Sequence, residues 1–178
     1  MWRQLKAIFP GSFDPVTLGH LDLMRRGARL FDRVVVAVLS NTAKAPMFTV
    51  EERLSLLEQE TVSLPNVDLI SYDGLLAVLA RDLGVKYILR GVRSEADCAY
   101  EIPMAQANRQ FIGTDHTGTD DTGLETVFMV TDAKYSYVSS GLIREIASFG
   151  FDTFHENTEM LDRWVPPAVK YMLINKNS

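Results

Sequence analysis

The sequence is poor in cysteine and lacks long apolar runs. Its single cysteine, Cys98, excludes an intrachain disulfide framework, so we expect a reducing compartment, the cytoplasm. No apolar stretch approaches the roughly 18 residues that a membrane span needs. Residues 1–8 also lack the long apolar region of a signal peptide. One cysteine and three scattered histidines give no structural zinc motif, so we expect no membrane segment and no structural zinc.

The sequence also contains few basic residues relative to acidic ones. The chain has 23 acidic against 18 basic side chains, a net charge of −5, which argues against a protein that coats nucleic acid. A local basic pocket for phosphates is compatible with that balance. The 178 residues, 47% hydrophobic and 23% charged, are typical of a globular chain and predict a single domain over residues 1–178.

Short β-rich segments alternate with amphipathic helical segments. The predicted strands are Leu5–Phe9, Arg33–Leu39, Val67–Ser71, Tyr87–Arg90 and Glu125–Val130. The predicted helices are Gly19–Phe31, Thr49–Thr61, Leu75–Leu83, Ala96–Phe111 and Leu142–Phe149. Residues 34–39 are continuously apolar, as in a parallel strand buried on both faces. The pattern predicts an α/β, doubly wound, Rossmann-like fold, a five-stranded parallel sheet with helices on both faces.

Local signals refine the ends of these elements. Thr49 and Glu52 have the spacing of a capping box, and Gly84 is placed to end a helix. Residues 113–123 contain no apolar residue, which predicts a mobile solvated loop. Its three aspartates do not match EF-hand spacing, so we do not predict a metal-binding loop there. The chain from about residue 156 predicts a short helical tail.

Polar side chains that suit phosphate groups follow several predicted strands. They are residues 10–20 after the first strand, Lys44 after the second, Arg90 and Arg93 at the fourth, and residues 135–141 after the fifth. In open α/β sheets, ligands bind outside the carboxyl ends of the strands. We therefore predict a phosphate site at this edge of the sheet, formed by one histidine, one lysine, two arginines and several hydroxyl groups.

The segment after the first strand contains residues that suit the binding of a phosphate group. Gly11 allows the backbone to approach a ligand closely, and Ser12 adds a hydroxyl group. Gly19 and His20 open a helix, whose free N–H groups favour an anion. A histidine there can donate a hydrogen bond to a phosphoryl oxygen without acting as a base. The simpler alternative is that His20 only caps the helix or packs locally.

These segments resemble the nucleotidylyltransferase superfamily. The signature consists of Pro10-Gly11-Ser12-Phe13-Asp14-Pro15 followed by Thr17-x-Gly19-His20. Two further segments narrow the resemblance to the phosphopantetheine adenylyltransferase family: Lys44-x-Pro46-Met47-Phe48-Thr49-x-Glu51-Glu52-Arg53, and Arg90-Gly91-Val92-Arg93 with Asp97, Tyr100 and Glu101. The resemblance covers most of the chain and fails mainly at residues 113–123 and near the C-terminus.

The resemblance implies a reaction and its participants. The phosphate of 4′-phosphopantetheine would attack the α-phosphorus of ATP in line, giving dephospho-coenzyme A and pyrophosphate without a covalent intermediate. The family uses Mg²⁺. It also suggests a homohexamer and coenzyme A as a feedback ligand.

The resemblance also implies site residues. His20 would be catalytic. The acceptor would be bound by Ser12, Lys44, Leu76 and Arg90, joined by Leu75, Met104 and Asn108. ATP would be bound by Ser12, Phe13, His20, Gly91, Val92, Arg93, Glu101, Tyr135, Ser136, Tyr137, Val138, Ser139, Ser140 and Gly141. No protein ligand to a metal is expected.

The chain departs from the family pattern in three places. Gly141 stands where a small hydroxyl residue is frequent, Tyr135 stands where Trp is frequent, and residues 113–123 are an insertion. Two other readings stay open. One is a superfamily member with another acceptor, such as nicotinamide mononucleotide or an alcohol phosphate. The other is a non-catalytic nucleotide-binding module, because a fold does not fix a function.

Overall fold

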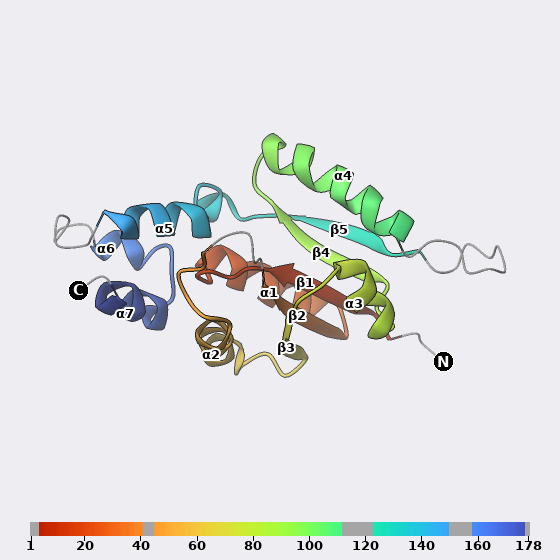
Figure 1. The fold of residues 1–178 in the computed structure, drawn as a ribbon, viewed down its shortest axis with the longest axis horizontal. Helices are drawn as coiled ribbons and strands as arrows, with labels where there is room; N and C mark the ends of the chain where they lie inside the picture. Colours follow the sequence, from red (N-terminus) through yellow and green to blue (C-terminus); the bar gives the residue numbers. More distant parts are fainter. Residues whose placement is uncertain (1–3, 41–44, 112–122, 150–157, 177–178) are drawn as a thin grey trace.

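The computed structural model describes residues 4–40, 45–111, 123–149 and 158–176. Figure 1 shows the arrangement of its elements. In chain order they are β1 (Lys6–Gly11), α1 (Leu18–Leu30), β2 (Arg33–Leu39), α2 (Val50–Thr61), β3 (Val67–Tyr72), α3 (Leu76–Asp82), β4 (Tyr87–Val92), α4 (Glu95–Phe111), β5 (Glu125–Val130), the 3-10 helix η2 (Ala133–Tyr135), α5 (Ser140–Ser148), α6 (Thr158–Leu161) and α7 (Pro167–Lys176).

The strands form one parallel sheet in the order β3-β2-β1-β4-β5, which confirms the predicted five-stranded sheet. β1 pairs with β2 along its whole length, but with β4 only at Ala7 and Ile8. Beyond Ile8 comes Pro10, which has no N–H group to donate to a ladder. β1 and β4 are also the strands between which the winding of the chain reverses, the place where open α/β sheets bind ligands.

Two hydrophobic clusters cover the two faces of the sheet, because successive side chains of a strand point to opposite faces. One cluster joins the sheet to α1, α2, α5 and α7 through Ala7, Phe9, Val34, Val36, Leu21, Met24, Leu57, Ile143, Val169 and Leu173. The other joins it to α3 through Ile8, Val35, Ala37, Ile88, Ala77, Leu79 and Ala80. This confirms the prediction of helices on both faces.

The helix α4 differs from the others. It contacts β4, β5 and α3, but none of residues 95–110 is buried. Figure 1 shows it lying along β4 and β5. Its exposed apolar side chains include Tyr100, Ile102 and Met104. The helices α5, α6 and α7 gather at one end of the molecule (Figure 1), and a hydrogen bond from the Leu18 amide to the Trp164 carbonyl ties this end to the start of α1.

The two local signals that mark helix ends are confirmed. The Thr49 hydroxyl accepts from the Glu52 amide, and the Glu52 carboxylate accepts from the Thr49 amide, which completes the capping box. Gly84 has a φ of +61°, a conformation that glycine adopts without strain. The Gly84 and Val85 amides donate to the Arg81 and Ala80 carbonyls, so α3 ends in a Schellman motif. The helical tail appears as α6 and α7.

Three strands are longer than predicted. β1 continues past Phe9 to Gly11, β3 past Ser71 to Tyr72, and β4 past Arg90 to Val92. Arginine and glycine carry little β propensity, but the ladder between β4 and β5 runs on to the pair of Val92 with Val130. The predicted end of the strand at Arg90 is therefore wrong by two residues.

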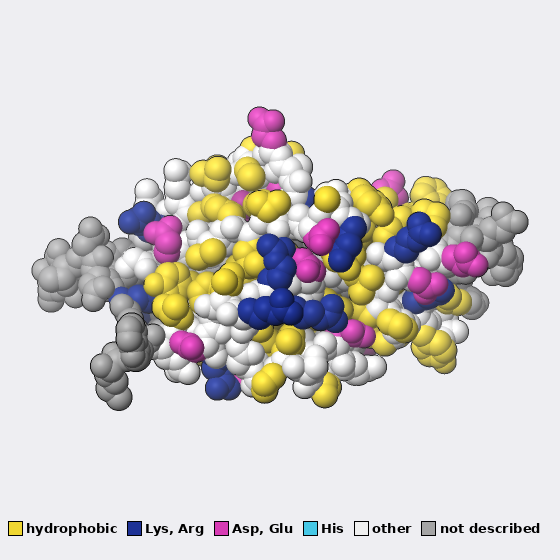
Figure 2. All heavy atoms as spheres, turned by 180° about the vertical axis from the view of Figure 1, so that it is seen from behind, with side chains coloured by type: hydrophobic (Ala, Val, Ile, Leu, Met, Phe, Trp, Pro, Cys, Tyr) yellow, Lys and Arg dark blue, Asp and Glu magenta, His cyan; other side chains and the backbone are white. Residues whose placement is uncertain are grey.

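Some predictions lie outside the described residues. They concern Lys44, residues 113–122 of the acidic segment and residues 156–157 at the start of the tail. Among the helices that the structure does describe, none is long and apolar enough to cross a bilayer. On the face opposite that of Figure 1, basic side chains gather near the centre with acidic ones beside several of them (Figure 2). The negative net charge thus coexists with local basic groups.

Candidate functional site

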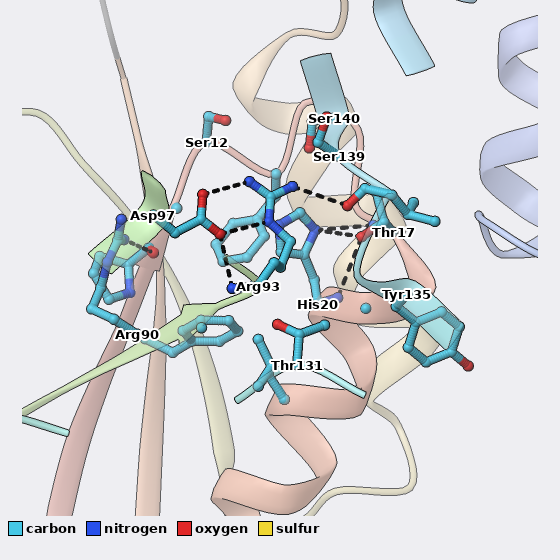
Figure 3. Close-up of a pocket in the computed structure, with 18 of the residues that line it drawn as sticks. Ser12, Thr17, His20, Arg90, Arg93, Asp97, Thr131, Tyr135, Ser139 and Ser140 are labelled. Atoms are coloured by element: carbon cyan, nitrogen blue, oxygen red, sulfur yellow. Dashed lines mark hydrogen bonds and ion pairs between the residues drawn. The ribbon is translucent and has the colours of Figure 1, made fainter. Parts of the chain in front are cut away.

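A polar cavity of about 270 Å³ opens at the carboxyl ends of the strands, where β1 and β4 part. Side chains from the β1–α1 turn, β4, α4 and the start of α5 surround it (Figure 3). It is lined by Phe9, Pro10, Gly11, Ser12, Phe13, Thr17, Gly19, His20, Leu23, Arg90, Gly91, Arg93, Asp97, Glu101, Thr131, Tyr135, Val138, Ser139 and Ser140. We call it the polar cavity.

His20 is held by the residue that caps its own helix. Thr17 is the N-cap of α1, and its hydroxyl oxygen accepts from the His20 amide at 3.3 Å. In return, the Thr17 amide donates to Nδ1 of His20 at 3.1 Å, and the Thr17 hydroxyl lies 3.0 Å from the same nitrogen. Figure 3 shows these bonds beside Arg93. The ring also meets the Phe13 ring edge to face, with centroids 5.2 Å apart.

This arrangement defines the protonation of His20. Withdrawal of the ring from bulk water, together with the positive charges of Arg93 and Arg90, lowers the pKa of His20 from 6.5 to about 4. The imidazole is therefore neutral at neutral pH. Because Nδ1 accepts the Thr17 amide proton, the ring proton lies on Nε2, so His20 can donate one hydrogen bond from Nε2.

Two arginines from the end of β4 are each paired with a carboxylate of α4. Arg93 makes a bidentate pair with Asp97, with Nε 2.9 Å from Oδ2, and also donates to the Val138 carbonyl at 3.1 Å. Arg93 and the Arg93 amide hold the pKa of Asp97 below its ordinary value, and Asp97 raises the pKa of Arg93. Arg90 makes a bidentate pair with Glu101 and donates to the Pro10 carbonyl at 2.9 Å.

The charged side chains that line the polar cavity therefore balance. Asp97 and Glu101 lie four residues apart and so share one face of α4, where each neutralises one arginine. Both arginines are partly exposed to the cavity, with 28% and 33% of their side chains accessible. An anion entering the cavity can bind them only by sharing or displacing a carboxylate. The pairs keep two cations extended and oriented before any ligand arrives.

The turn after β1 is tight. Phe13 has a φ of +47°, which is uncommon for a residue other than glycine. Its ring is buried beneath Gly11, where an added Cβ atom would come within 2.8 Å of the ring. The Asp14 carboxylate accepts from the Met47 and Phe48 amides at 3.0 and 2.8 Å. The turn is thus fixed against the loop that precedes α2.

A second, mostly apolar pocket of about 310 Å³ adjoins the polar cavity. The two share Pro10, Arg90 and Glu101, so the Arg90–Glu101 pair stands where they meet. The apolar pocket lies between α3 and α4 and is also lined by Leu39, Gly74, Leu75, Leu76, Ala77, Ile88, Tyr100, Met104, Ala105, Ala107, Asn108 and Thr126. Together the cavities suit a ligand with a phosphate at one end and a less polar arm.

Most of the residues that the sequence predicts for the site line one of these cavities. Ser12, Phe13, His20, Arg90, Gly91, Arg93, Glu101, Tyr135, Val138, Ser139 and Ser140 line the polar cavity. Leu75, Leu76, Met104 and Asn108 line the apolar pocket with Arg90 and Glu101. Lys44 lies outside the described residues.

Four predicted residues do not line the polar cavity: Val92, Ser136, Tyr137 and Gly141. Val92 is buried at the end of β4, and the Ser136 hydroxyl donates to the Ala133 carbonyl in η2. Tyr137 is largely exposed and meets Trp164 edge to face. A run of neighbouring residues cannot all face one cavity, because η2 and the turn before α5 point successive side chains in different directions.

The hydroxyl groups of Ser139 and Ser140 are already used within the protein. Ser139 caps α5 by accepting from the Leu142 amide at 3.0 Å, and Ser140 donates to the Pro15 carbonyl at 2.8 Å. Ser139 is thus the N-cap of α5. Its role fixes the N-terminus of a nine-residue helix at the wall of the polar cavity.

Sequence reasoning missed several residues that build the site. Asp97 was noted only as part of a motif, although its spacing of four from Arg93 is the signal of a helical ion pair. Leu23 and Thr131 line the cavity without any sequence signal. Arg53 precedes the buried residues Leu56 and Leu57 of α2 by three and four positions, a spacing that places a cation on the inner face.

The sequence matches known proteins over most of its length. Residues 8–146 match the cytidylyltransferase-like family. A phosphopantetheine adenylyltransferase of Lachnoclostridium phytofermentans is 42% identical over 169 residues, 95% of this chain and 93% of that protein. The phosphopantetheine adenylyltransferase of Symbiobacterium thermophilum is 48% identical over 149 residues, 84% of this chain and 86% of that protein.

The fold matches solved structures of low sequence identity. The nicotinic acid mononucleotide adenylyltransferase of Plasmodium falciparum in complex with NaAD superposes with a TM-score of 0.66 at 12% identity, over 98% of this chain and 99% of that chain. A Vibrio parahaemolyticus protein assigned by name as a nicotinate-nucleotide adenylyltransferase superposes with a TM-score of 0.61 at 18% identity, over 97% of this chain and 100% of that chain. These likenesses concern the fold, whereas the sequence identities concern the family. The chain belongs to the phosphopantetheine adenylyltransferase family, within the cytidylyltransferase-like nucleotidyltransferases.

Proposed function

We propose that this protein transfers the adenylyl group of ATP to 4′-phosphopantetheine, giving dephospho-coenzyme A and pyrophosphate. The observation that carries the proposal is the junction of a polar, arginine-bearing cavity with an apolar pocket at Arg90. An acceptor that carries a phosphate on a long, weakly charged arm needs both environments. The homology to phosphopantetheine adenylyltransferases supports the same assignment.

The reaction is a direct displacement at phosphorus. An acceptor phosphate oxygen forms a bond to the α-phosphorus while the bond from that phosphorus to the bridging oxygen breaks, and pyrophosphate leaves with the electron pair. No protein nucleophile is needed. Positioning two anions and stabilising charge on the transferring group supply most of the catalysis in such reactions.

His20 serves as a hydrogen-bond donor in this proposal. Its neutral ring, oriented through Nδ1 by Thr17, presents the Nε2 proton to an oxygen of the transferring phosphoryl group. A donor already fixed in place needs no reorganisation as negative charge develops in the transition state. Because the ring is neutral, it forms no ion pair with the phosphates of the bound substrates in the ground state.

Arg90 anchors the acceptor phosphate in this proposal, and Arg93 the ATP phosphates. Arg90 stands where the two cavities meet, so a phosphate bound there has its arm directed along Leu76 and Met104. The incoming phosphate competes with Glu101 for the Arg90 guanidinium. The helix α5 places its N-terminus at the same cavity, where free amides favour phosphate oxygens.

We propose that Mg²⁺ enters as part of the substrate, bound to the triphosphate of ATP. The described residues contain no group of three or more His, Cys, Asp or Glu side chains able to hold a metal ion. The two carboxylates of the polar cavity are both paired with arginine. Mg²⁺ commonly binds through substrate phosphates and water.

We further propose that coenzyme A binds as a feedback ligand, because it carries the pantetheine arm that the apolar pocket suits. A cytoplasmic location is proposed on the evidence of the single cysteine, which is free in the structure.

We also propose that the chain assembles as a homohexamer. Support comes from the edge strand β5, which exposes 38% of Phe128 and 70% of Val130, and from α4, which exposes Tyr100 and Ile102. Exposed apolar side chains on an edge strand are a site of association unless another surface covers them.

The acceptor assignment is tested by steady-state kinetics with Arg90→Met. With ATP and Mg²⁺, the wild type should release pyrophosphate with 4′-phosphopantetheine and not with nicotinamide mononucleotide. Loss of charge-assisted hydrogen bonds should raise the KM for 4′-phosphopantetheine roughly 10- to 100-fold. Arg81→Met, which alters an exposed arginine of α3, is the control and should leave the KM unchanged. Turnover with nicotinamide mononucleotide alone would show that the acceptor is wrong.

The role of His20 is tested by His20→Ala. Because one preorganised donor to the transition state is lost, kcat should fall roughly 100- to 1,000-fold. The Kd for ATP, measured by calorimetry, should change little. Thr17→Ser keeps the hydroxyl that caps α1 and should retain most of the activity. A large loss of ATP affinity with unchanged kcat would instead assign His20 to ground-state binding.

The assembly is tested by sedimentation. The wild type should sediment at six times the chain mass of 20.0 kDa. The double variant Phe128→Lys, Val130→Glu should give smaller species, because charges on the edge strand oppose association. Leu30→Lys, on an exposed position of α1, should sediment like the wild type. A monomeric wild type would refute the hexamer.

A further inference from the structure

Arginines from three different elements bind the backbone at the end of β1 and in the turn that follows it. The carbonyl groups of Pro10, Ser12 and Asp14 accept hydrogen bonds from Arg90 of β4, Arg53 of α2 and Arg144 of α5, respectively. The Pro15 carbonyl accepts a fourth bond, from the Ser140 hydroxyl. Carbonyl oxygens carry partial negative charge, and the guanidinium groups fix the directions in which these oxygens point.

Arg53 is the buried member of the three. Only 4% of the residue is exposed, and it does not line the polar cavity. Its Nη1 atom lies 2.8 Å from the Ser12 carbonyl oxygen and 3.5 Å from that of Leu39, and Nε lies 3.3 Å from that of Thr49. Within the described ranges, no carboxylate forms an ion pair with it.

Stability alone is a weak reason for this arrangement. Taking a cation out of water is costly, and hydrophobic side chains of similar volume often replace even a buried ion pair without loss of stability. Arg53 donates hydrogen bonds to the Ser12 and Leu39 carbonyls and so links the ends of β1 and β2. Those ends border the cavity in which the reaction is proposed to occur.

The turn that Arg53 binds is strained. Phe13 follows Ser12 directly and has a φ of +47°, a conformation that persists only when its surroundings enforce it. Ser12 lines the polar cavity, and the Phe13 ring contacts the His20 ring. A rotation of the Ser12–Phe13 peptide would move both the serine side chain and the aromatic support of the histidine.

We propose that Arg53 is a positioning residue for adenylyl transfer. By binding the Ser12 carbonyl, it holds the Ser12–Phe13 peptide in its strained orientation and keeps that oxygen directed away from substrate phosphates. The inference rests on the proposed function of the polar cavity. Arg53, which lies outside the cavity, would thus control the positions of Ser12 and Phe13, which line it.

The test compares Arg53→Met, which removes the donors, with Arg53→Lys, which keeps the charge and one donor group. Leu57→Ala, a buried position of the same helix, is the control for lost stability. Two quantities are measured well below the melting temperature of each variant. They are kcat with its KM values, and deuterium exchange of the backbone amides in peptides covering residues 9–16 and 125–130.

For Arg53→Met we expect kcat to fall roughly 10- to 100-fold, the effect of misplacing reacting groups by about 1 Å. KM values should change less than kcat, exchange in residues 9–16 should become faster, and exchange in residues 125–130 should not change. Arg53→Lys should recover part of kcat, and Leu57→Ala should lower the melting temperature without lowering kcat.

Two results would overturn the proposal: a kcat for Arg53→Met within about twofold of wild type, or unchanged exchange in residues 9–16. If Arg53→Met does not fold, Arg53→Lys and Arg53→Gln carry the same comparison. A wild type without turnover would refute the proposed function, while the exchange measurement would still decide whether Arg53 holds the turn.

Discussion

The reciprocal hydrogen bonding of Thr17 and His20 is the constraint on which the site depends. It is at once the cap of α1 and the support of the imidazole, since the Thr17 amide that donates to Nδ1 would otherwise lack an intrahelical partner. The capping of α1 thereby also determines the tautomer of His20. The low pKa of His20 follows from desolvation of its partly buried ring and from the neighbouring arginines, which the same cavity needs for phosphates.

The cavity itself exists because two adjacent strands part. Pro10 has no N–H group, and β1 pairs with β4 only up to Ile8. Arg90 then bridges the gap by donating to the Pro10 carbonyl while its other nitrogens bind Glu101. The arginines thus have partners both in the turn and on α4. Substrate phosphates meet cations that are already extended and oriented.

Much of the fold could be predicted from the sequence. Continuous apolar runs such as residues 34–39 indicated parallel strands, and Thr49 and Gly84 marked helix ends, because these signals are local. Strand ends were less certain, since the ladder to β5 extended β4 beyond Arg90. Pairing with a distant strand has no local signature.

The site could be predicted in part, and for a similar reason. Residues at strand ends and helix starts, such as Ser12, His20 and Arg90, meet at one edge because the topology brings them there. What could not be predicted is which partner each side chain takes. The pairing of Arg90 with Glu101 and of Arg53 with the Ser12 carbonyl depends on contacts across 11 and 41 residues of sequence.

Whether His20 is a neutral donor fixed by Thr17 can be measured by ¹⁵N NMR of the histidine rings during a pH titration, with His20→Gln used to assign the signal. We expect His20 to stay neutral from pH 8 down to near its pKa of about 4, with its proton on Nε2. A ring that titrates near the ordinary value of 6.5, or one that carries its proton on Nδ1, would contradict it.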